Sequence, residues 1–111
     1  MEAFALSKFN RISPKKLRRV ALAINHLYFQ EALDILTNLP QKGAVVLYKT
    51  LKSAGANLQN KDPESREDEW IIREITVNQG PSLKRVKSRA KGKADRICRP
   101  TSHLKIVLAE E

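Results

Sequence analysis

Residues 80–101 constrain the fold most, because this stretch is too highly charged to lie in a hydrophobic core. It contains eight basic residues and a single acid, Asp95. A stretch of this length with so few apolar residues is usually either functional or disordered. We expect it to project outward as a long hairpin with its tip near residues 90–93, where Gly92 permits a turn. Arms of about ten residues would then reach roughly 33 Å.

A second basic segment, residues 8–19, holds six of the chain's 21 lysines and arginines and no acid. The formal net charge of the whole chain is +9. Charge gathered in two segments repels itself unless a polyanion neutralises it, so the pattern indicates nucleic acid as the partner. Solvated charge that serves solubility alone, or a disordered basic loop, is the alternative. No run approaches the ~18 apolar residues of a membrane-spanning helix, so we expect no membrane partner.

The first basic segment leads into a predicted helix. Ser13 can cap the free amides of a helix whose first residue is Pro14, because proline at that position loses no needed hydrogen bond. The apolar stripe of this helix is Leu17, Val20, Ala21 and Ile24. Its remaining faces are cationic, so we expect a helix that is apolar inside and basic outside.

Two further helices are predicted, at about residues 30–38 and 41–60. Their inward positions are Ala32, Leu33 and Leu36 in the shorter helix, with Leu39 as a further candidate, and Ala44, Leu47, Tyr48, Leu51, Ala54, Gly55 and Leu58 in the longer one. The small residues Ala54 and Gly55 would let another element approach the longer helix closely. An exposed acidic turn is expected at residues 61–69.

Alternating apolar residues predict strands at residues 70–78 and 102–109. In the first, Ile71, Ile75 and Val77 are assigned to one face and Trp70, Ile72 and Thr76 to the other; in the second, Leu104, Ile106 and Leu108 form the apolar face. The two strands can pair antiparallel, and a third strand at residues 3–9 has a weaker pattern. The predicted fold is α+β: residues 1–111 form one domain, a three-helix body packed on a small antiparallel sheet, with a long protruding basic β-hairpin.

Nothing in the sequence indicates catalysis or a bound metal. Cys98 has no identifiable base beside it, and neither His26 nor His103 is paired with another metal ligand at a recognisable spacing. Two tyrosines, one tryptophan and three phenylalanines are expected to lie in the core, and none lies in the basic hairpin. We therefore expect no enzyme activity and no cofactor, and recognition of nucleic acid through its backbone and shape.

Several short motifs occur in an order that resembles one family. They are Ser13-Pro14-Lys15-Lys16, Ser53-Ala54-Gly55-Ala56-Asn57, Gly80-Pro81, Lys84-Arg85, Arg89-Ala90-Lys91-Gly92-Lys93-Ala94 and Thr101-Ser102-His103. Together they cover nearly the whole chain and resemble the large-subunit ribosomal protein twenty-two family. The resemblance implies a structural constituent of the large ribosomal subunit that binds large-subunit rRNA, aids subunit assembly and lines the nascent-peptide exit tunnel with its hairpin.

The resemblance also implies which residues bind RNA. The predicted set is Lys8, Arg11, Ser13, Lys15, Lys16, Arg18, Lys84, Arg85, Lys87, Ser88, Arg89, Lys91, Lys93, Arg96, Arg99 and His103. The tip that lines the tunnel would be Arg89, Ala90, Lys91, Gly92 and Lys93. Lysine and arginine suit this role because they donate hydrogen bonds and carry charge that RNA phosphates accept.

The implied partners are large-subunit rRNA, neighbouring large-subunit ribosomal proteins and the nascent peptide, with no homo-oligomer. We expect a cytoplasmic ribosome, and an organellar ribosome stays open. Two rival functions are a DNA-binding regulator that uses the first basic helix and an RNA-processing enzyme that uses His103. The first lacks a clear recognition-helix pair, and the second lacks a paired acid and base.

Overall fold

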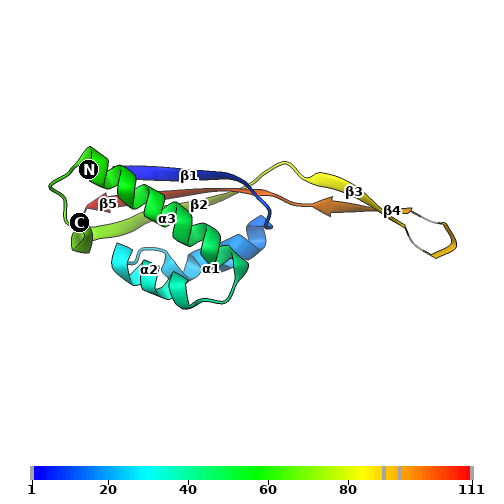
Figure 1. The fold of residues 1–111 in the computed structure, drawn as a ribbon, viewed down its shortest axis with the longest axis horizontal. Helices are drawn as coiled ribbons and strands as arrows, with labels where there is room; N and C mark the ends of the chain where they lie inside the picture. The colour runs from blue at the N-terminus through cyan, green and yellow to red at the C-terminus, as the bar shows by residue number, and fades with distance from the viewer. Residues whose placement is uncertain (1, 89, 93, 111) are drawn as a thin grey trace.

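The structure is a computed structural model that describes residues 2–88, 90–92 and 94–110, without the side chains of Asp95 and Arg96. Figure 1 shows a body of helices and strands from which a thin two-stranded arm extends. The principal extents are 65 × 25 × 16 Å and the radius of gyration is 17.1 Å. A compact chain of this length would have a radius of gyration of about 13 Å, so the arm makes the molecule markedly elongated.

The described elements follow the predicted order. They are β1 (Glu2–Asn10), α1 (Pro14–Ile24), α2 (Phe29–Asn38), α3 (Lys42–Lys61), β2 (Trp70–Gln79), β3 (Leu83–Ser88), β4 (Ala94–Arg99) and β5 (Ser102–Glu110), with short 3₁₀ turns at Glu67–Glu69 and Ala90–Gly92. The three predicted helices and the α+β class are confirmed. The acidic segment before β2 forms the expected turn, and its side chains are largely exposed.

The body contains a three-stranded antiparallel sheet in the order β1, β5, β2. The central strand, β5, buries Leu104, Ile106 and Leu108 completely, as predicted. α3 packs on β1 and β5, while α1 packs on β2. The core therefore lies between the helices and one face of the sheet.

The faces of β1 differ from what the sequence suggested for the aromatic residues. Ala3 and Ala5 point into the core at 5% exposure, whereas Phe4 and Leu6 are 53% exposed and Phe9 is 62% exposed. For Phe4 and Leu6 the reason is steric: α3 packs on the other face of β1, where the side chains are alanines. Phe9 is exposed where the pairing with β5 becomes irregular between Ser7 and Asn10. The prediction that all three phenylalanines are core residues is therefore wrong for Phe4 and Phe9.

β2 contains an irregularity that the alternating pattern did not reveal. Its register with β5 shifts between Ile72 and Glu74. An extra residue in one strand reverses which face the following side chains occupy. Trp70 and Ile72 before the shift, and Val77 after it, are therefore all buried. The prediction of two separate apolar faces on this strand is therefore wrong, since the bulge brings Val77 of one set to the same face as Trp70 and Ile72 of the other, while Ile71, Ile75 and Thr76 are half-buried.

The start and the buried face of α1 are as predicted. The Ser13 hydroxyl oxygen accepts a hydrogen bond from the Lys16 backbone N–H at 3.3 Å, and Pro14 is the first helical residue. The predicted stripe is buried in full: Leu17, Val20, Ala21 and Ile24. In α2, Ala32 and Leu36 are buried while Leu33 and Leu39 are half-buried; in α3, the predicted set is buried except Tyr48, which is half-buried.

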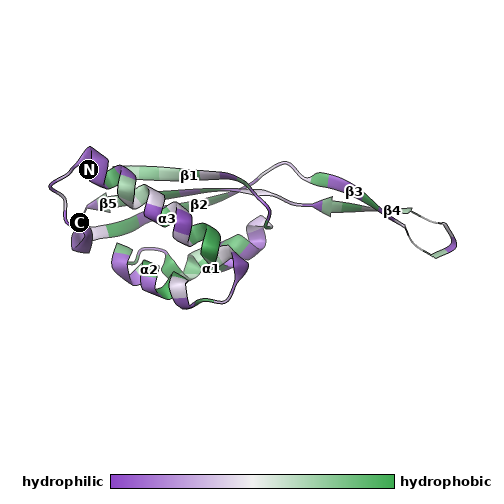
Figure 2. Ribbon diagram, viewed as in Figure 1, coloured by the Kyte–Doolittle hydropathy of each residue, from purple (hydrophilic) through white to green (hydrophobic). Residues whose placement is uncertain are grey.

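The segment between β2 and β5 contains the paired strands β3 and β4. Their register aligns Leu83 with Arg99 and Ser88 with Ala94. Each strand has six residues, fewer than the ten expected per arm. Pro81 and Pro100 flank the ladder at its root, where they can donate no backbone hydrogen bond. Figure 2 shows hydrophobic and hydrophilic residues interspersed along this arm.

Candidate nucleic-acid interface

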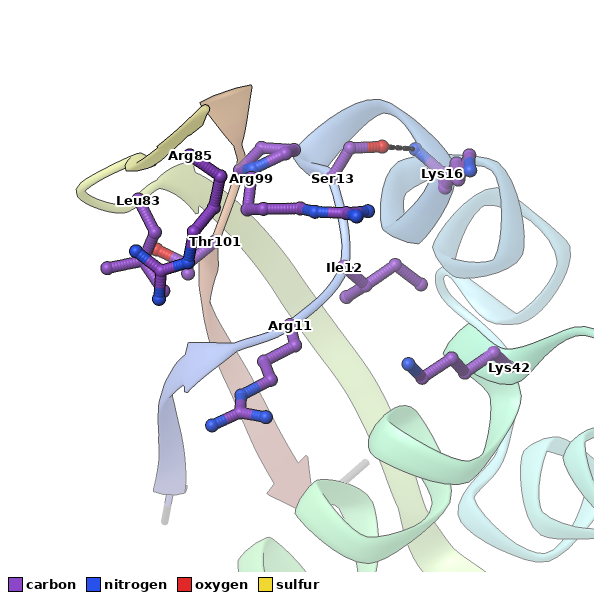
Figure 3. Close-up of a pocket in the computed structure, with 10 residues that line it drawn as sticks. Arg11, Ile12, Ser13, Lys16, Lys42, Leu83, Arg85, Arg99 and Thr101 are labelled. Carbon is purple, nitrogen blue, oxygen red and sulfur yellow. Dashed lines mark hydrogen bonds between the residues drawn. The ribbon is translucent and has the colours of Figure 1, made fainter. Parts of the chain in front are cut away.

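A cationic hollow lies where the hairpin leaves the body. Its volume is about 590 Å³, and it is lined by Arg11, Ile12, Ser13, Lys16, Lys42, Leu83, Arg85, Arg99, Pro100 and Thr101. Figure 3 shows these side chains around the junction of the hairpin with the first and third helices. We call it the root hollow. Segments far apart in the chain thus supply one concave, positively charged surface.

Local structure explains why the five cations of the root hollow meet. Arg11 lies in the short connection that leaves β1, and Lys16 lies in the first turn of α1. Lys42 is the first residue of α3. Arg85 and Arg99 come from opposite strands of the hairpin, near its root. Each cation is therefore held by a different regular element or its immediate flank.

Two helices begin at the root hollow, which adds to its positive potential. The cap residue of α1, Ser13, and the first residue of α3, Lys42, both line it. Helix N-termini carry partial positive charge and free backbone N–H groups, so they attract anions. A lysine at a helix start is electrostatically unfavourable on its own. An anion in the root hollow would remove that penalty at Lys42.

Carboxylates are absent from the described lining of this surface. Among the described residues, the ion pairs join Arg66 to Asp68 and Glu69, and Arg73 to Glu2. All of these groups lie at the other end of the body or on the sheet, outside the lining of the root hollow. The cations of the hollow are thus left for an external anion, and lysine and arginine bind phosphate oxygens well.

Beyond the root hollow, the described side chains of β3 are all exposed. The strand alternates its side chains between two faces, so Lys84 points to one face while Arg85 and Lys87 point to the other. Arg85 also donates from Nη1 to the Lys84 carbonyl at 3.1 Å. Positive charge therefore surrounds the arm, which suits an element enclosed by RNA better than one lying on a flat surface.

The structure brings together only part of the predicted set. Arg11, Ser13, Lys16, Arg85 and Arg99 line the root hollow. Lys8, Lys15, Lys84, Lys87, Ser88 and Lys91 are exposed on β1, α1 or the arm. Arg89, Lys93 and the side chain of Arg96 lie outside the described residues.

Besides Ser13 and Arg85, two more predicted residues make hydrogen bonds within the protein. Arg18 donates from Nη2 to the Val77 carbonyl at 2.7 Å, which ties α1 to β2. The Nδ1 atom of His103 accepts the backbone N–H of Phe9 at 3.1 Å. Each contact gives its residue a structural role that sequence reasoning did not anticipate.

Sequence reasoning missed Lys42 as a member of this surface. Its position at the predicted start of the third helix was a usable clue, because a cation there opposes the helix dipole. Its nearness to the hairpin could not be read from the sequence, because it depends on how α3 docks against β1 and the connection that follows β1.

Other kinds of site find little support in the described part of the chain. Within it, no group of three or more histidine, cysteine or acidic side chains is placed to hold a metal ion. None of the described helices is long and apolar enough to cross a membrane. Cys98 is exposed on β4.

Comparison with known proteins assigns the chain to a family. The family model described as ribosomal protein L22p/L17e matches residues 5–109. Proteins named large ribosomal subunit protein uL22 are similar over essentially the whole chain. The one from Fusobacterium nucleatum is 46% identical over 111 residues, covering 100% of this chain and 99% of the relative. The one from Akkermansia muciniphila is 43% identical, covering 100% and 98%. The chain therefore belongs to the ribosomal protein L22p/L17e family.

Proposed function

We propose that this protein is a structural constituent of the large ribosomal subunit that binds its rRNA and stabilises the subunit during assembly. The observation that supports this proposal most directly is the root hollow. Five cations from separate elements line it, and its described lining contains no carboxylate. A cluster of this kind is costly in the free protein because like charges repel. RNA phosphates remove the cost, since they neutralise the cations and release bound counterions.

The mechanism follows from the shape of the surface. The root hollow is concave and the arm is long and thin, so the two can touch RNA segments that are far apart. Neutralised phosphates can then approach one another closely. One small protein thereby holds distant RNA segments in a fixed relative position.

We assign residues 80–101 to an extended RNA-binding hairpin within one ribosomal-protein domain. Its tip would line the peptide exit tunnel and meet the nascent peptide. Lys91 and Gly92 have positive φ values of 64° and 73°, which supports a tight turn at the tip. Arg89 and Lys93, which belong to the proposed tip, lie outside the described residues. We also propose that the protein contacts neighbouring ribosomal proteins and that it belongs to a cytoplasmic ribosome.

The proposed role needs no catalysis and no cofactor. In the part of the chain that the structure describes, His103 contacts Phe9 and not a carboxylate. The rival DNA-binding regulator would need a free helix to enter a groove. α1 carries its cations on exposed faces, but Arg18 is engaged with β2 and the N-terminus of α1 lies in the root hollow. These contacts favour RNA packing around the whole junction.

The test compares two pairs of charge removals in cells. Arg85→Ala with Arg99→Ala removes two cations of the root hollow, and Lys49→Ala with Lys52→Ala removes two exposed cations from α3 as a matched control. We expect tagged wild type and the control to sediment with large subunits on a gradient, at moderate and at raised salt. The root-hollow variant should shift to free protein as salt rises, while its circular dichroism spectrum stays native.

Two results would count against the proposal. Wild-type protein that sediments free, or with chromosomal DNA, would refute ribosomal assembly and favour the regulator. Equal incorporation of both double variants at raised salt would show that the root hollow does not bind RNA.

A further inference from the structure

We propose that Phe9 is a nucleobase-stacking residue, held ready by His103, on which an unpaired base of the bound RNA lies flat. The proposal rests on the function proposed above and adds a recognition element that is not cationic. Phe9 is 62% exposed, follows Lys8 directly and lies two residues before Arg11. Exposed apolar side chains are common on protein surfaces, so exposure alone does not mark a ligand site.

The backbone of Phe9 is strained. Its φ angle is 57°, which lies in the left-handed region that residues other than glycine rarely adopt. This conformation coincides with the irregular pairing of β1 and β5 between Ser7 and Asn10. Strained residues persist where surrounding contacts hold them, and they concentrate at ligand-binding positions.

Contacts on both sides of Phe9 hold it in this conformation. Ser7 donates from Oγ to Asn10 Oδ1 at 2.9 Å, and Asn10 donates from Nδ2 to the Ser7 carbonyl at 3.1 Å. The Phe9 N–H donates to His103 Nδ1 at 3.1 Å. The Phe9 and His103 rings meet edge to face, with centroids 5.0 Å apart and planes at 89°. A perpendicular contact of this kind covers at most one face of the Phe9 ring, and the residue stays 62% exposed with this contact in place.

His103 is in turn fixed from its far side. A Cβ atom added to Gly80 would lie 3.3 Å from His103 Nε2 and 2.5 Å from Thr101 Oγ1, so glycine leaves the room that the imidazole occupies. In the neutral imidazole, a hydrogen bond accepted at Nδ1 assigns the ring proton to Nε2. His103 is therefore a positioning residue: it orients Phe9 and is itself packed against the root of the hairpin.

The surroundings favour a nucleobase as the occupant. Asn10 pairs with Ser102, and Thr101, the neighbour of Ser102, lines the root hollow, so Phe9 lies next to the surface proposed for RNA. Phosphates bound in the root hollow would bring bases of the same strand within reach of the ring. A phenyl ring offers no hydrogen bonds, so it would stack on any base without selecting its identity.

The test uses deproteinised bacterial large-subunit rRNA as the probe. Phe9→Leu keeps apolar volume but loses the flat ring, and the loss of one base–ring stack should weaken binding about 5- to 140-fold. Because no charge changes, the dependence of affinity on salt should keep its wild-type slope. Phe4→Leu is the matched control, since Phe4 is similarly exposed on the same strand but lies under the Lys105 ammonium group.

Fluorescence gives a second readout that does not depend on affinity. In Phe9→Trp, the new indole should be quenched when rRNA binds, whereas in Phe4→Trp it should not; native Trp70 is 1% exposed and gives a constant background. Phe9→Leu binding within twofold of wild type, or equal quenching at both positions, would overturn the stacking role. Wild type that fails to bind rRNA at all would refute the proposed function instead, and the stacking with it.

Discussion

The ring of Phe29 occupies the space that a side chain at Gly55 would need: a Cβ atom added there would lie 2.8 Å from Phe29 Cε1 and Cζ. Phe29 also meets Trp70 edge to face, with ring centroids 5.2 Å apart. α2, α3 and β2 therefore touch at one point. The absence of a side chain at residue 55 makes this contact possible.

Gly55→Ala should accordingly destabilise the fold. Alanine raises helix propensity by about 1 kcal/mol relative to glycine, but overpacking a core costs about 1–3 kcal/mol, and here two rings that already contact each other must move. We expect a net loss of stability and a lower Tm, measured by far-ultraviolet circular dichroism. Ser53→Ala, on the exposed face of the same helix, controls for propensity and should not lower Tm. A Tm for Gly55→Ala at or above wild type would contradict the close contact.

Local rules predicted the elements whose determinants lie close together in the sequence. Ser13 and Pro14 mark the start of α1 because capping depends on atoms three residues apart. The faces of the helices and of β5 followed from their apolar periods for the same reason. The small residues of α3 indicated that another element packs closely against this helix. They did not indicate that the residues in contact are Phe29 and Trp70.

The remaining features depend on contacts between distant segments. The bulge in β2 has no marker in its own sequence, and it is needed because both halves of the strand must face the helices. Phe4 points outward because α3 covers the other face of β1, and Phe9 is exposed where the pairing of β1 with β5 becomes irregular. The root hollow is the clearest case, since Lys42 joins it only through the docking of α3. The sequence identified the charged segments, whereas the structure identified which of their side chains meet.

His26 offers a test of backbone strain outside the interface. It follows the C-cap of α1 with a φ angle of 64°, and its side chain is exposed. Left-handed backbone costs L-residues about 1–2 kcal/mol, while glycine loses about 0.5–1 kcal/mol more chain entropy on folding. His26→Gly should therefore stabilise the protein by about 0.5–1 kcal/mol in denaturant unfolding. His26→Ala keeps the strain and should bring no gain; equal effects of the two variants would contradict the explanation.

The carboxyl group of Glu110 lies at the end of the body opposite the root hollow, and we expect it to make the stability of the fold depend on pH. A hydrogen bond between its carboxyl group and that of Asp62 raises the pKa of Glu110 above its ordinary value of 4.5, and lost hydration and charge repulsion act in the same direction. The folded state therefore holds this proton more tightly than the unfolded state. The resulting stabilisation is present below pH 4.5 and is lost as pH rises through the raised pKa.

Glu110→Gln should mimic the protonated form at every pH. We expect the variant to match wild type in acid and to have the higher Tm near neutrality, with the gap opening as pH rises from about 4.5. Thermal unfolding across this range measures the gap. Asp34→Asn removes one negative charge from the exposed face of α2 and controls for the change in net charge. A difference in Tm between the variant and wild type that grows as the pH falls would contradict the predicted direction of the pKa shift.

Ser13 separates folding from RNA binding most directly, because its hydroxyl oxygen caps α1 while its side chain lines the root hollow. Asp caps helices about as well as Ser, whereas Ala costs about 1 kcal/mol. Ser13→Asp should therefore keep the wild-type Tm but weaken rRNA binding, because it places a carboxylate among five cations. Ser13→Ala should lower Tm while binding, measured well below that Tm, stays near wild type. Unchanged rRNA affinity in the stable aspartate variant would show that RNA does not enter the root hollow.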